Sequence, residues 1–396
     1  MKKIVVVALS GGVDSSVAAL ILKKRGYKVI GLFMHNWEDP VFNCTWEKDS
    51  IDAMLSAYKL NIPFQIIEMK NEYKKYVINY MYEEYEKGKT PNPDIVCNRI
   101  IKFNLFLKIA INSLGADCIA TGHYVRKKEF IKNNKKIYRL LIGKDLNKDQ
   151  SYFLCQLNQY QLEKSIFPIG DFTKKEVRKI AKLNGLYNAF KKESQGLCFV
   201  GKIQLPKFLQ RKINPKKGKI ICIDSNSDIY KKNNQIIHFY KKKLDNFSYL
   251  KKKIYYKESD GKLIGHHNGA YLFTKGQRKG ISIGGFKKAL FVIDTDIKTN
   301  IVYTGLGINH PGLYSKYLFI KDNDVHWIRN DIILNGKNKM NVFCRIRHRQ
   351  PLQKSILHNL KNGILIEFYE SQRAITEGQF AAWYINKELI GSGIIS

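Results

Sequence analysis

The most constraining feature of the sequence is an apolar run at residues 4–9 that leads into the string SGGVDSS at residues 10–16 and then into helical spacing. Glycines directly after a buried strand let the backbone approach a ligand closely, and the following helix points its N–H groups and its dipole at an anion. An ordinary glycine turn with a Ser or Asp cap would have the same composition. A Walker loop requires Gly-Lys-Ser/Thr, and no lysine follows these glycines, so we predict a phosphate-binding loop of another kind.

The first half of the chain alternates short apolar runs with segments of helical periodicity. The predicted buried strands are residues 4–9, 29–34, 64–68 and 118–121, and the predicted helices are 15–25, 46–60, 71–87 and 98–114. This alternation is typical of an α/β fold with a doubly wound parallel sheet. Ligands bind such sheets at the carboxyl ends of the strands, and the glycine loop lies at the carboxyl end of the first one.

The second half of the chain has a different texture. After one more predicted helix at 171–186, short β-like runs are separated by turn residues; they lie at 219–223, 269–273, 290–294, 301–304, 342–347, 363–368 and 379–385. We therefore predict three domains: a catalytic domain at 1–205, a small central β-rich module at 206–286 and a C-terminal β-barrel at 287–396. The lysine-rich stretch at about 225–260 is interpreted as an exposed insertion in the central module rather than a specific RNA clamp.

Charge and cysteine content narrow the class of protein. The 396 residues carry a formal net charge of +34, which favours a polyanionic partner such as nucleic acid. The lysines are spread along the chain, and A+T-rich coding drift would produce the same excess, so the charge marks no single surface. Seven cysteines without a CxxC pair fit neither a disulfide framework nor a zinc site, so we expect a reducing cytoplasm. No stretch approaches the ~20 apolar residues of a membrane span.

Two cysteines have contexts that suggest reactivity. Cys97 follows TPNPDIV at the start of a helical pattern, and a thiol at a helix N-terminus has a lowered pKa. Cys198 lies in ESQGLCFVG, as a loop-borne thiol would. Each alone could equally be a small buried residue. A nucleobase carbonyl oxygen is a poor leaving group, but it can depart as AMP once adenylated. A phosphate loop combined with two reactive thiols therefore indicates thiolation.

The string at 10–16 resembles the PP-loop of the ATP pyrophosphatase superfamily, whose members cleave ATP between its α- and β-phosphates and use AMP to activate an oxygen. Over nearly its whole length the chain resembles the bacterial tRNA-specific 2-thiouridylase family. The strings that carry this resemblance are GLFMHNW (31–37), TPNPDIVCN (90–98), ATGHY (120–124), KDQSYFL (148–154), SQGLCF (194–199), GQRKGISIGG (276–285) and TEGQFAAWY (376–384). The resemblance implies a sulfurtransferase that converts the wobble uridine of tRNA, U34, to 2-thiouridine at the expense of ATP.

The resemblance also implies site residues. The nucleotide would bind Ala8, Leu9, Ser10, Gly11, Gly12, Val13, Asp14, Ser15, Met34 and Gly122. The residues implied to meet tRNA are Asn92, Pro93 and Asp94 at the target base, with Lys148, Asp149, Gln150, Arg347 and His348 elsewhere. A splayed base edge can be read by amide and carboxylate groups, whereas the KDQ string could also be a solvated turn. His348 stands where the family has tyrosine, and its planar ring keeps the capacity to stack.

Catalysis by the family implies that Cys198 carries a persulfide and that Cys97 is the nucleophile. Cys97 either frees the sulfur by forming a disulfide with Cys198 or assists in another way. Asp14 would position Mg²⁺, serve as a base or simply cap the helix, and no site built from protein ligands alone is expected for a metal. The implied partners are ATP, Mg²⁺, the tRNAs for Lys, Glu and Gln, and a sulfur donor, either a cysteine desulfurase or a relay protein.

Further expectations concern the C-terminal domain and the alternatives. In RIRHRQ, Arg345, Arg347 and Arg349 recur with period two, which on a strand would place all three on one face, toward a phosphate backbone or simply toward solvent. We expect a monomer. The rival activity is that of another PP-loop enzyme, such as a lysidine synthase, in which an amine attacks the adenylate; such an enzyme does not need both thiols. A non-catalytic RNA-binding protein would have no use for the PP-loop.

Overall fold

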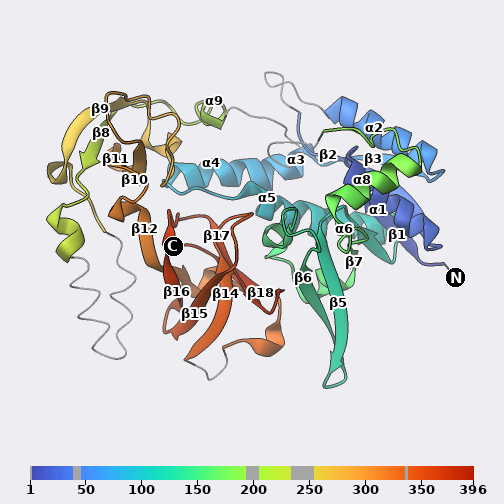
Figure 1. The fold of residues 1–396 in the computed structure, drawn as a ribbon. Coiled ribbons are helices and arrows are strands. Elements are labelled where there is room, and N and C mark those ends of the chain that lie inside the picture. Colours follow the sequence, from blue (N-terminus) through green and yellow to red (C-terminus); the bar gives the residue numbers. More distant parts are fainter. Residues whose placement is uncertain (1, 39–45, 193–204, 233–253, 335–337) are drawn as a thin grey trace.

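The computed structural model describes residues 2–38, 46–192, 205–232, 254–334 and 338–396. Within these residues the strands form a five-stranded, a four-stranded and a nine-stranded sheet. Figure 1 shows the five-stranded sheet near the N-terminus, the four-stranded sheet at the opposite end of the molecule and the largest sheet below a helix that runs between them. Cys198, Cys44 and the predicted end of the catalytic domain at 205 lie outside or at the edge of the described residues.

The N-terminal sheet is wholly parallel and has the strand order β3-β2-β1-β4-β7. Its strands are β1 (Ile4–Ala8), β2 (Lys28–His35), β3 (Phe64–Glu68), β4 (Cys118–Ala120) and β7 (Ser165–Ile166). Successive side chains of β1 alternate between two hydrophobic cores, with Val6 in one and Val5 and Val7 in the other. The predicted doubly wound α/β fold is confirmed. The predicted burial of β3 on both faces is wrong, because β3 is an edge strand and its residues are exposed or half-buried.

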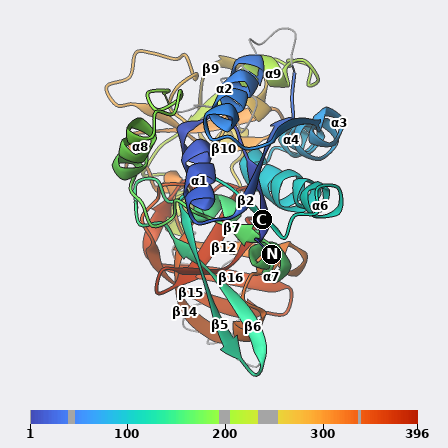
Figure 2. The ribbon, with the colours of Figure 1, turned by 90° about the vertical axis from the view of Figure 1, so that its right-hand side faces the viewer.

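Helices cover both faces of this sheet, as Figure 2 shows. One core contains residues of α1 (Val13–Lys24), α2 (Trp46–Lys59) and α8 (Lys174–Leu183). The other contains residues of α3 (Lys70–Tyr73), η1 (Lys74–Ile78), α4 (Asn79–Glu86), α5 (Pro93–Val96), η2 (Cys97–Leu105) and α6 (Phe106–Asn112). The segments α3-η1-α4 and α5-η2-α6 are continuous in sequence, with π-helical η1 and η2, so the four helices predicted between 15 and 114 are confirmed to within a few residues.

The strand order reverses direction between β1 and β4. β1 pairs with β2 on one side and with β4 on the other, so the loops that follow β1 and β4 leave the sheet in opposite directions at its centre. Such a switch point opens a crevice at the carboxyl ends of the strands, and this is where parallel α/β sheets bind ligands. The loop after β1 is the SGGVDSS string and the loop after β4 belongs to ATGHY, so both strings border this crevice.

The four-stranded sheet has the order β10-β11-β8-β9. Its strands are β8 (Gly218–Ile223), β9 (Lys262–His267), β10 (Leu290–Asp296) and β11 (Ile301–Leu306). The predicted boundary at 286 falls inside this sheet, and the pairing of β11 with β8 favours a boundary after 306. The strand predicted at 269–273 is wrong: residues 270–272 form the 3₁₀ turn η6 (Ala270–Leu272), because Gly269 takes a φ of +144° and breaks the extended run.

The nine-stranded sheet is antiparallel and forms the C-terminal barrel. Its strands are β12 (Tyr314–Lys321), β13 (Val325–Trp327), β14 (Lys339–Arg345), β15 (Gln353–Leu360), β16 (Gly363–Arg373), β17 (Phe380–Ile385) and β18 (Glu388–Ile394), joined by β5 (Val125–Lys132) and β6 (Lys135–Ile142). The β5–β6 hairpin belongs to the first half of the chain, yet β6 pairs with β18. Its turn places Asn133 and Asn134 at positive φ, the geometry of a tight two-residue hairpin.

Short helices complete the connections: η3 (Ser151–Leu154), α7 (Gln159–Glu163) and α9 (Leu205–Leu209). α9 is held against α4, because the rings of Tyr82 and Phe208 stack with centroids 5.2 Å apart and the Tyr82 hydroxyl donates to the Phe208 carbonyl. Among the helices described, none combines the length and apolar character that crossing a membrane would require.

Candidate nucleotide and tRNA site

The loop after β1 is shaped by close backbone contacts. Gly11 has a φ of +71°, and a Cβ there would lie 2.1 Å from the carbonyl oxygen of Asp49 in α2, so only glycine fits. Gly12 is the N-cap residue of α1 and supplies no side-chain cap. The hydroxyl of Ser15 donates to the Gly12 carbonyl (3.0 Å) and accepts from the Ser10 amide (3.2 Å). The loop therefore holds its shape through its own residues and presents the N-terminal end of α1 to an anion.

The remaining residues predicted to bind the nucleotide lie around this loop. Ala8 and Leu9 are 7% and 1% exposed, so they can present only backbone to a ligand. Gly122 packs directly on the loop: a Cβ there would lie 2.7 Å from the Ser15 nitrogen and 2.8 Å from the Asp14 carbonyl carbon. Met34 is 2% exposed near the end of β2, the strand next to β1. The fold thus gathers all of the predicted nucleotide residues at the switch point.

Asp14, the acidic residue of the loop, is bound by two side chains from other elements. The Lys174 ammonium lies 2.7 Å from each Asp14 carboxylate oxygen, and the Tyr124 hydroxyl donates to Oδ1 at 2.7 Å. Lys174 is the first residue of α8, whose N-terminus is fixed by a capping box between Thr173 and Glu176. The Lys174 side chain is 11% exposed and that of Asp14 30%, so this ion pair faces the crevice rather than the core. A lysine absent from the loop string is thus supplied by the fold.

A second set of contacts supports the loop from behind. The Asn188 amide nitrogen donates to the Gly11 carbonyl (3.1 Å) and to the Ser16 hydroxyl (2.8 Å). Lys191 donates to the Gly11 carbonyl at 3.3 Å and forms ion pairs with Asp49 and Asp52 of α2. The chain that leads toward position 198 is therefore anchored on the phosphate loop. Residues 192–198 could reach at most about 25 Å from Lys191 if fully extended, which keeps Cys198 within reach of the loop.

Cys97 lies in the helix that follows the NPD string. The helix begins at Pro93, with Asn92 as N-cap accepting the Ile95 amide at 3.3 Å. Cys97 is one turn further along, at the first residue of π-helical η2, and is 1% exposed. The expectation that it lies at the helix N-terminus is therefore wrong, because the helix starts four residues earlier, and the dipole effect is concentrated in the first turn.

The other described cysteines are unsuited to catalysis. Burial raises the pKa of Cys155 to about 12 and raises the pKa values of Cys118, Cys222 and Cys344 as well. A thiol with a raised pKa is a poor nucleophile at neutral pH. These four residues match the expectation that they have no chemical role.

The three segments predicted to meet tRNA are connected by contacts. The amide of Asn98, next to Cys97, donates to the Phe153 carbonyl at 3.2 Å. The Phe153 and His348 rings have centroids 4.3 Å apart, and His348 Nε2 lies 3.2 Å from the Asp149 carbonyl. The structure therefore brings the NPD, KDQ and Arg-His segments side by side. Burial lowers the pKa of His348, so its ring is neutral at pH 7.

The KDQ string also reaches the phosphate loop. Gln150 Oε1 accepts the Tyr124 amide at 3.0 Å, and Tyr124 in turn contacts Asp14. The Asp149 side chain faces inward: it is 2% exposed and accepts from Gly143, Ser151 and Arg345. The assignment of Asp149 as an RNA-contacting side chain is thus not supported by its position, because its carboxylate is occupied and covered.

The predicted arginine row is wrong. β14 ends at Arg345, whose side chain turns inward to the Asp149 carboxylate at 2.8 Å. Arg347 and Arg349 lie in the turn after the strand, and Arg349 has a φ of +64°. The period-two argument fails because the extended conformation stops before the second arginine. Arg347 remains exposed and donates to the Ala374 carbonyl.

Several site residues could not be recognised from the sequence. Lys174, Asn188 and Lys191 lie more than 150 residues from the loop they contact. The helix-start pattern D-F-T-K-K-E marks Lys174 as a first-turn residue, where a cation is unfavourable unless it has an anionic partner. That mismatch is the one signal that could have identified it.

The fold and this site define a PP-loop nucleotide-binding protein with two additional β domains. Family models match at residues 3–202 (tRNA methyl transferase HUP domain), 244–306 (tRNA methyl transferase PRC-barrel domain) and 319–395 (aminomethyltransferase beta-barrel domain). The tRNA-specific 2-thiouridylase MnmA of Christiangramia forsetii is 54% identical over 400 residues, and that of Flavobacterium johnsoniae is 54% identical over 398, with all of each chain covered. The enzyme of that name from Coxiella burnetii strain RSA 493 is 40% identical and 98% covered by the whole of this chain. The chain belongs to the tRNA-specific 2-thiouridylase MnmA family.

Proposed function

We propose that the protein is a sulfurtransferase that converts U34 of tRNA to 2-thiouridine. The observation that carries this proposal is the continuity of the site: the phosphate loop reaches Gln150 through Asp14 and Tyr124, and the NPD helix reaches the KDQ and Arg-His segments. The relatives that match over the whole chain carry the name of this activity. A single connected site for a nucleotide, a base and an RNA backbone is what adenylation of a tRNA base requires.

The proposed reaction has two chemical stages. In the first, the C2 oxygen of U34 attacks the α-phosphorus of ATP, forming the adenylated base and releasing pyrophosphate. In the second, the terminal sulfur of a Cys198 persulfide attacks C2, and AMP departs with the former uridine oxygen. Cys97 attacks the other sulfur of the persulfide, so the S–S bond breaks and a Cys97–Cys198 disulfide forms; an external thiol reduces this disulfide before the next turnover.

Charge placement supports a triphosphate at the loop. Each phosphate needs donors, and the loop backbone, the α1 N-terminus and Lys174 provide them at one point. We propose that Lys174 exchanges its contact with Asp14 for the phosphates when ATP binds. The described residues contain no cluster of three metal-ligating side chains. An Asp14 carboxylate freed in this way fits Mg²⁺, which is usually held by one or two carboxylates together with substrate phosphates and supplies charge neutralisation there.

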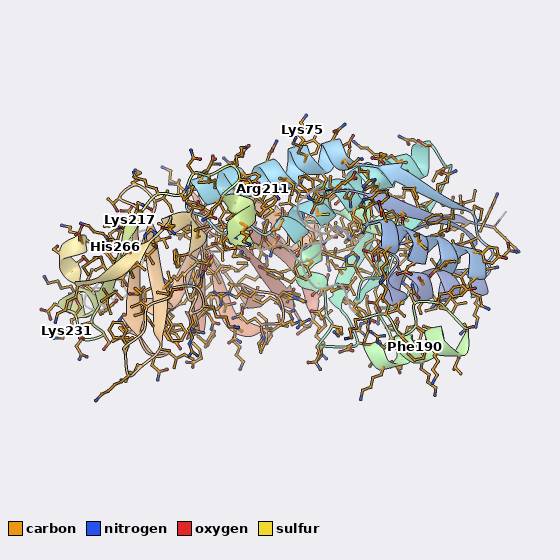
Figure 3. The ribbon with its side chains drawn as sticks, turned by 90° about the horizontal axis from the view of Figure 1, so that it is seen from above. Lys75, Phe190, Arg211, Lys217, Lys231 and His266 are labelled. Carbon is orange, nitrogen blue, oxygen red and sulfur yellow. The ribbon has the colours of Figure 1, made fainter. Side chains whose placement is uncertain are left out.

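Exposed cations offer a surface for the tRNA backbone. Lys74 and Lys75 of η1 are exposed, as are Arg211, Lys212 and Lys217 beyond α9. Figure 3 shows Lys75, Arg211 and Lys217 along one side of the molecule, from the helix η1-α4 to the four-stranded sheet. Because the Tyr82–Phe208 stack holds α9 on α4, these groups form a fixed basic ridge. Phosphate contacts of this kind orient an RNA without reading its sequence. The tRNAs for Lys, Glu and Gln are the proposed substrates, and a cysteine desulfurase or a relay protein the proposed sulfur donor.

Nucleoside mass spectrometry tests this proposal. The protein is incubated with unmodified tRNA, ATP, Mg²⁺ and a persulfide source, and the tRNA is digested. We expect 2-thiouridine at U34, together with AMP and pyrophosphate in the supernatant. AMP release accompanied by an amine-modified base would instead support the lysidine synthase-like activity, and no AMP release with tRNA present would exclude both.

A further inference from the structure

The segment Thr90–Asn92, immediately before the NPD helix, is held by side chains from the C-terminal barrel. The Gln379 amide nitrogen donates to the carbonyl oxygens of Thr90 at 2.8 Å and Pro91 at 3.3 Å. Its amide oxygen lies 3.5 Å from the Asn92 side-chain nitrogen. One glutamine, at the start of β17 and almost 290 residues away in sequence, therefore contacts three consecutive residues of the predicted base-recognition segment.

Neighbouring contacts make this approach close and specific. The Thr90 amide donates to the Glu377 carbonyl at 2.9 Å. The Thr90 hydroxyl lies 3.1 Å from the hydroxyl of Thr274, which follows η6 in the central module. Gly378 has a φ of +85°, and a Cβ there would lie 2.9 Å from the Lys89 Cβ and 3.1 Å from the Thr90 nitrogen. Three parts of the fold thus converge on Thr90–Asn92.

The sequence of this segment explains why external support is needed. Prolines at positions 91 and 93 have no backbone N–H, so the segment cannot hold itself through regular backbone pairing. Asn92 uses its side-chain oxygen to cap the helix at Ile95 and its side-chain nitrogen to approach Gln379. The position of Asn92 therefore fixes both the start of the Cys97 helix and the contact with the barrel.

We propose that Gln379 is a positioning residue that sets the geometry of the target-uridine pocket from the barrel. This inference rests on the proposed function, since it takes Asn92–Asp94 as the segment that meets the uridine. Gln379 does not touch the reacting atoms; it fixes the three residues whose placement decides whether the C2 oxygen aligns with the α-phosphorus. The barrel then acts as part of the mould for the uridine and not only as a surface for the tRNA.

The test compares Gln379→Met with Gln372→Met. Methionine keeps the length and apolar volume of the side chain but removes both polar atoms. Gln372 is a matched control: it lies in β16 of the same barrel, is 6% exposed and hydrogen-bonds to Gln350 and the Glu370 carbonyl, both of which also belong to the C-terminal domain. For Gln379→Met we expect kcat for U34 thiolation to fall about 10- to 100-fold, the effect of misplacing reacting groups by about 1 Å. The KM for ATP and the Kd for tRNA should stay within about twofold of the control.

Hydrogen exchange gives a second readout that does not depend on activity. In Gln379→Met, the amides of the peptide containing residues 90–98 should exchange faster than in the wild type, while the phosphate-loop peptide stays unchanged. Exchange equal to that of Gln372→Met, or a kcat equal to that of the control, would overturn the proposal. A loss confined to tRNA affinity would also overturn it, because it would make Gln379 an RNA contact. If the wild type makes no thiouridine, the proposed function fails, and the exchange result still reports on Gln379.

Discussion

Removal of the Lys174 ammonium gives the sharpest test of the phosphate site. This group makes two 2.7 Å contacts with Asp14, and the surrounding side chains leave it 11% exposed at the mouth of the crevice. Lys174→Met keeps the length of the side chain and removes the charge. Asp14 retains the Tyr124 hydroxyl and is 30% exposed, so water can replace the ammonium and the fold should persist.

The expected magnitude follows from the hydrogen bond that the ammonium would donate to a phosphate. A hydrogen bond to a charged group contributes about 1.5–3 kcal/mol, so removing one such bond should weaken ATP binding about 10- to 150-fold. The exchange of partners reduces this value, because ATP binding to the wild type must break the ion pair with Asp14. We therefore expect the Kd to rise toward the lower part of this range, about 10- to 30-fold.

Calorimetric titration with an ATP analogue that cannot be cleaved between the α- and β-phosphates measures this effect without turnover. Lys175→Met is the matched control, since it removes an equal charge from the exposed adjacent position of α8. Lys174→Arg should recover only part of the affinity, because a planar guanidinium cannot occupy the place of a compact ammonium. If Lys174→Met binds the analogue as tightly as Lys175→Met, Lys174 is only the structural partner of Asp14, and the charge assignment is refuted.

Three further outcomes are expected. Cys198→Ala should abolish 2-thiouridine in nucleoside mass spectrometry while AMP and pyrophosphate are still released with tRNA, and normal thiolation would exclude the persulfide role. Arg345→Met leaves the buried Asp149 carboxylate without its cation and should cost about 3 kcal/mol of stability, with partial recovery in Arg345→Met/Asp149→Asn; denaturant unfolding that shows no recovery would contradict a direct pair. Burial lowers the pKa of His123 well below 6.5, so the unfolded chain binds a proton there that the folded chain does not, and stability falls as pH drops below 6.5. The thermal midpoint should therefore be lower at about pH 5.5 than at about pH 7.5, and His123→Gln should reduce the difference.

The local features of the fold were readable from the sequence because they depend on neighbouring residues. The apolar runs of β1, β2 and β4 are buried on both sides, so their continuous hydrophobicity predicts them directly. β3 has a similar pattern but lies at the edge, and the position of a strand within a sheet is not encoded in its own residues. The β5–β6 hairpin, mostly polar, is stabilised in part by pairing with β18, so its own sequence gives a weak signal.

Short patterns along the chain were enough to identify the phosphate loop, the succession of strands and helices around it and the strings that meet at the site, since each pattern has a local physical meaning. No such pattern reveals that Lys174 supplies the charge missing from that loop, that Asp149 turns inward to Arg345, or that Gln379 holds the segment before Cys97. Each of these contacts joins residues more than 150 positions apart. Their partners are chosen by packing, and packing exists only once the sheet and the barrel have come together.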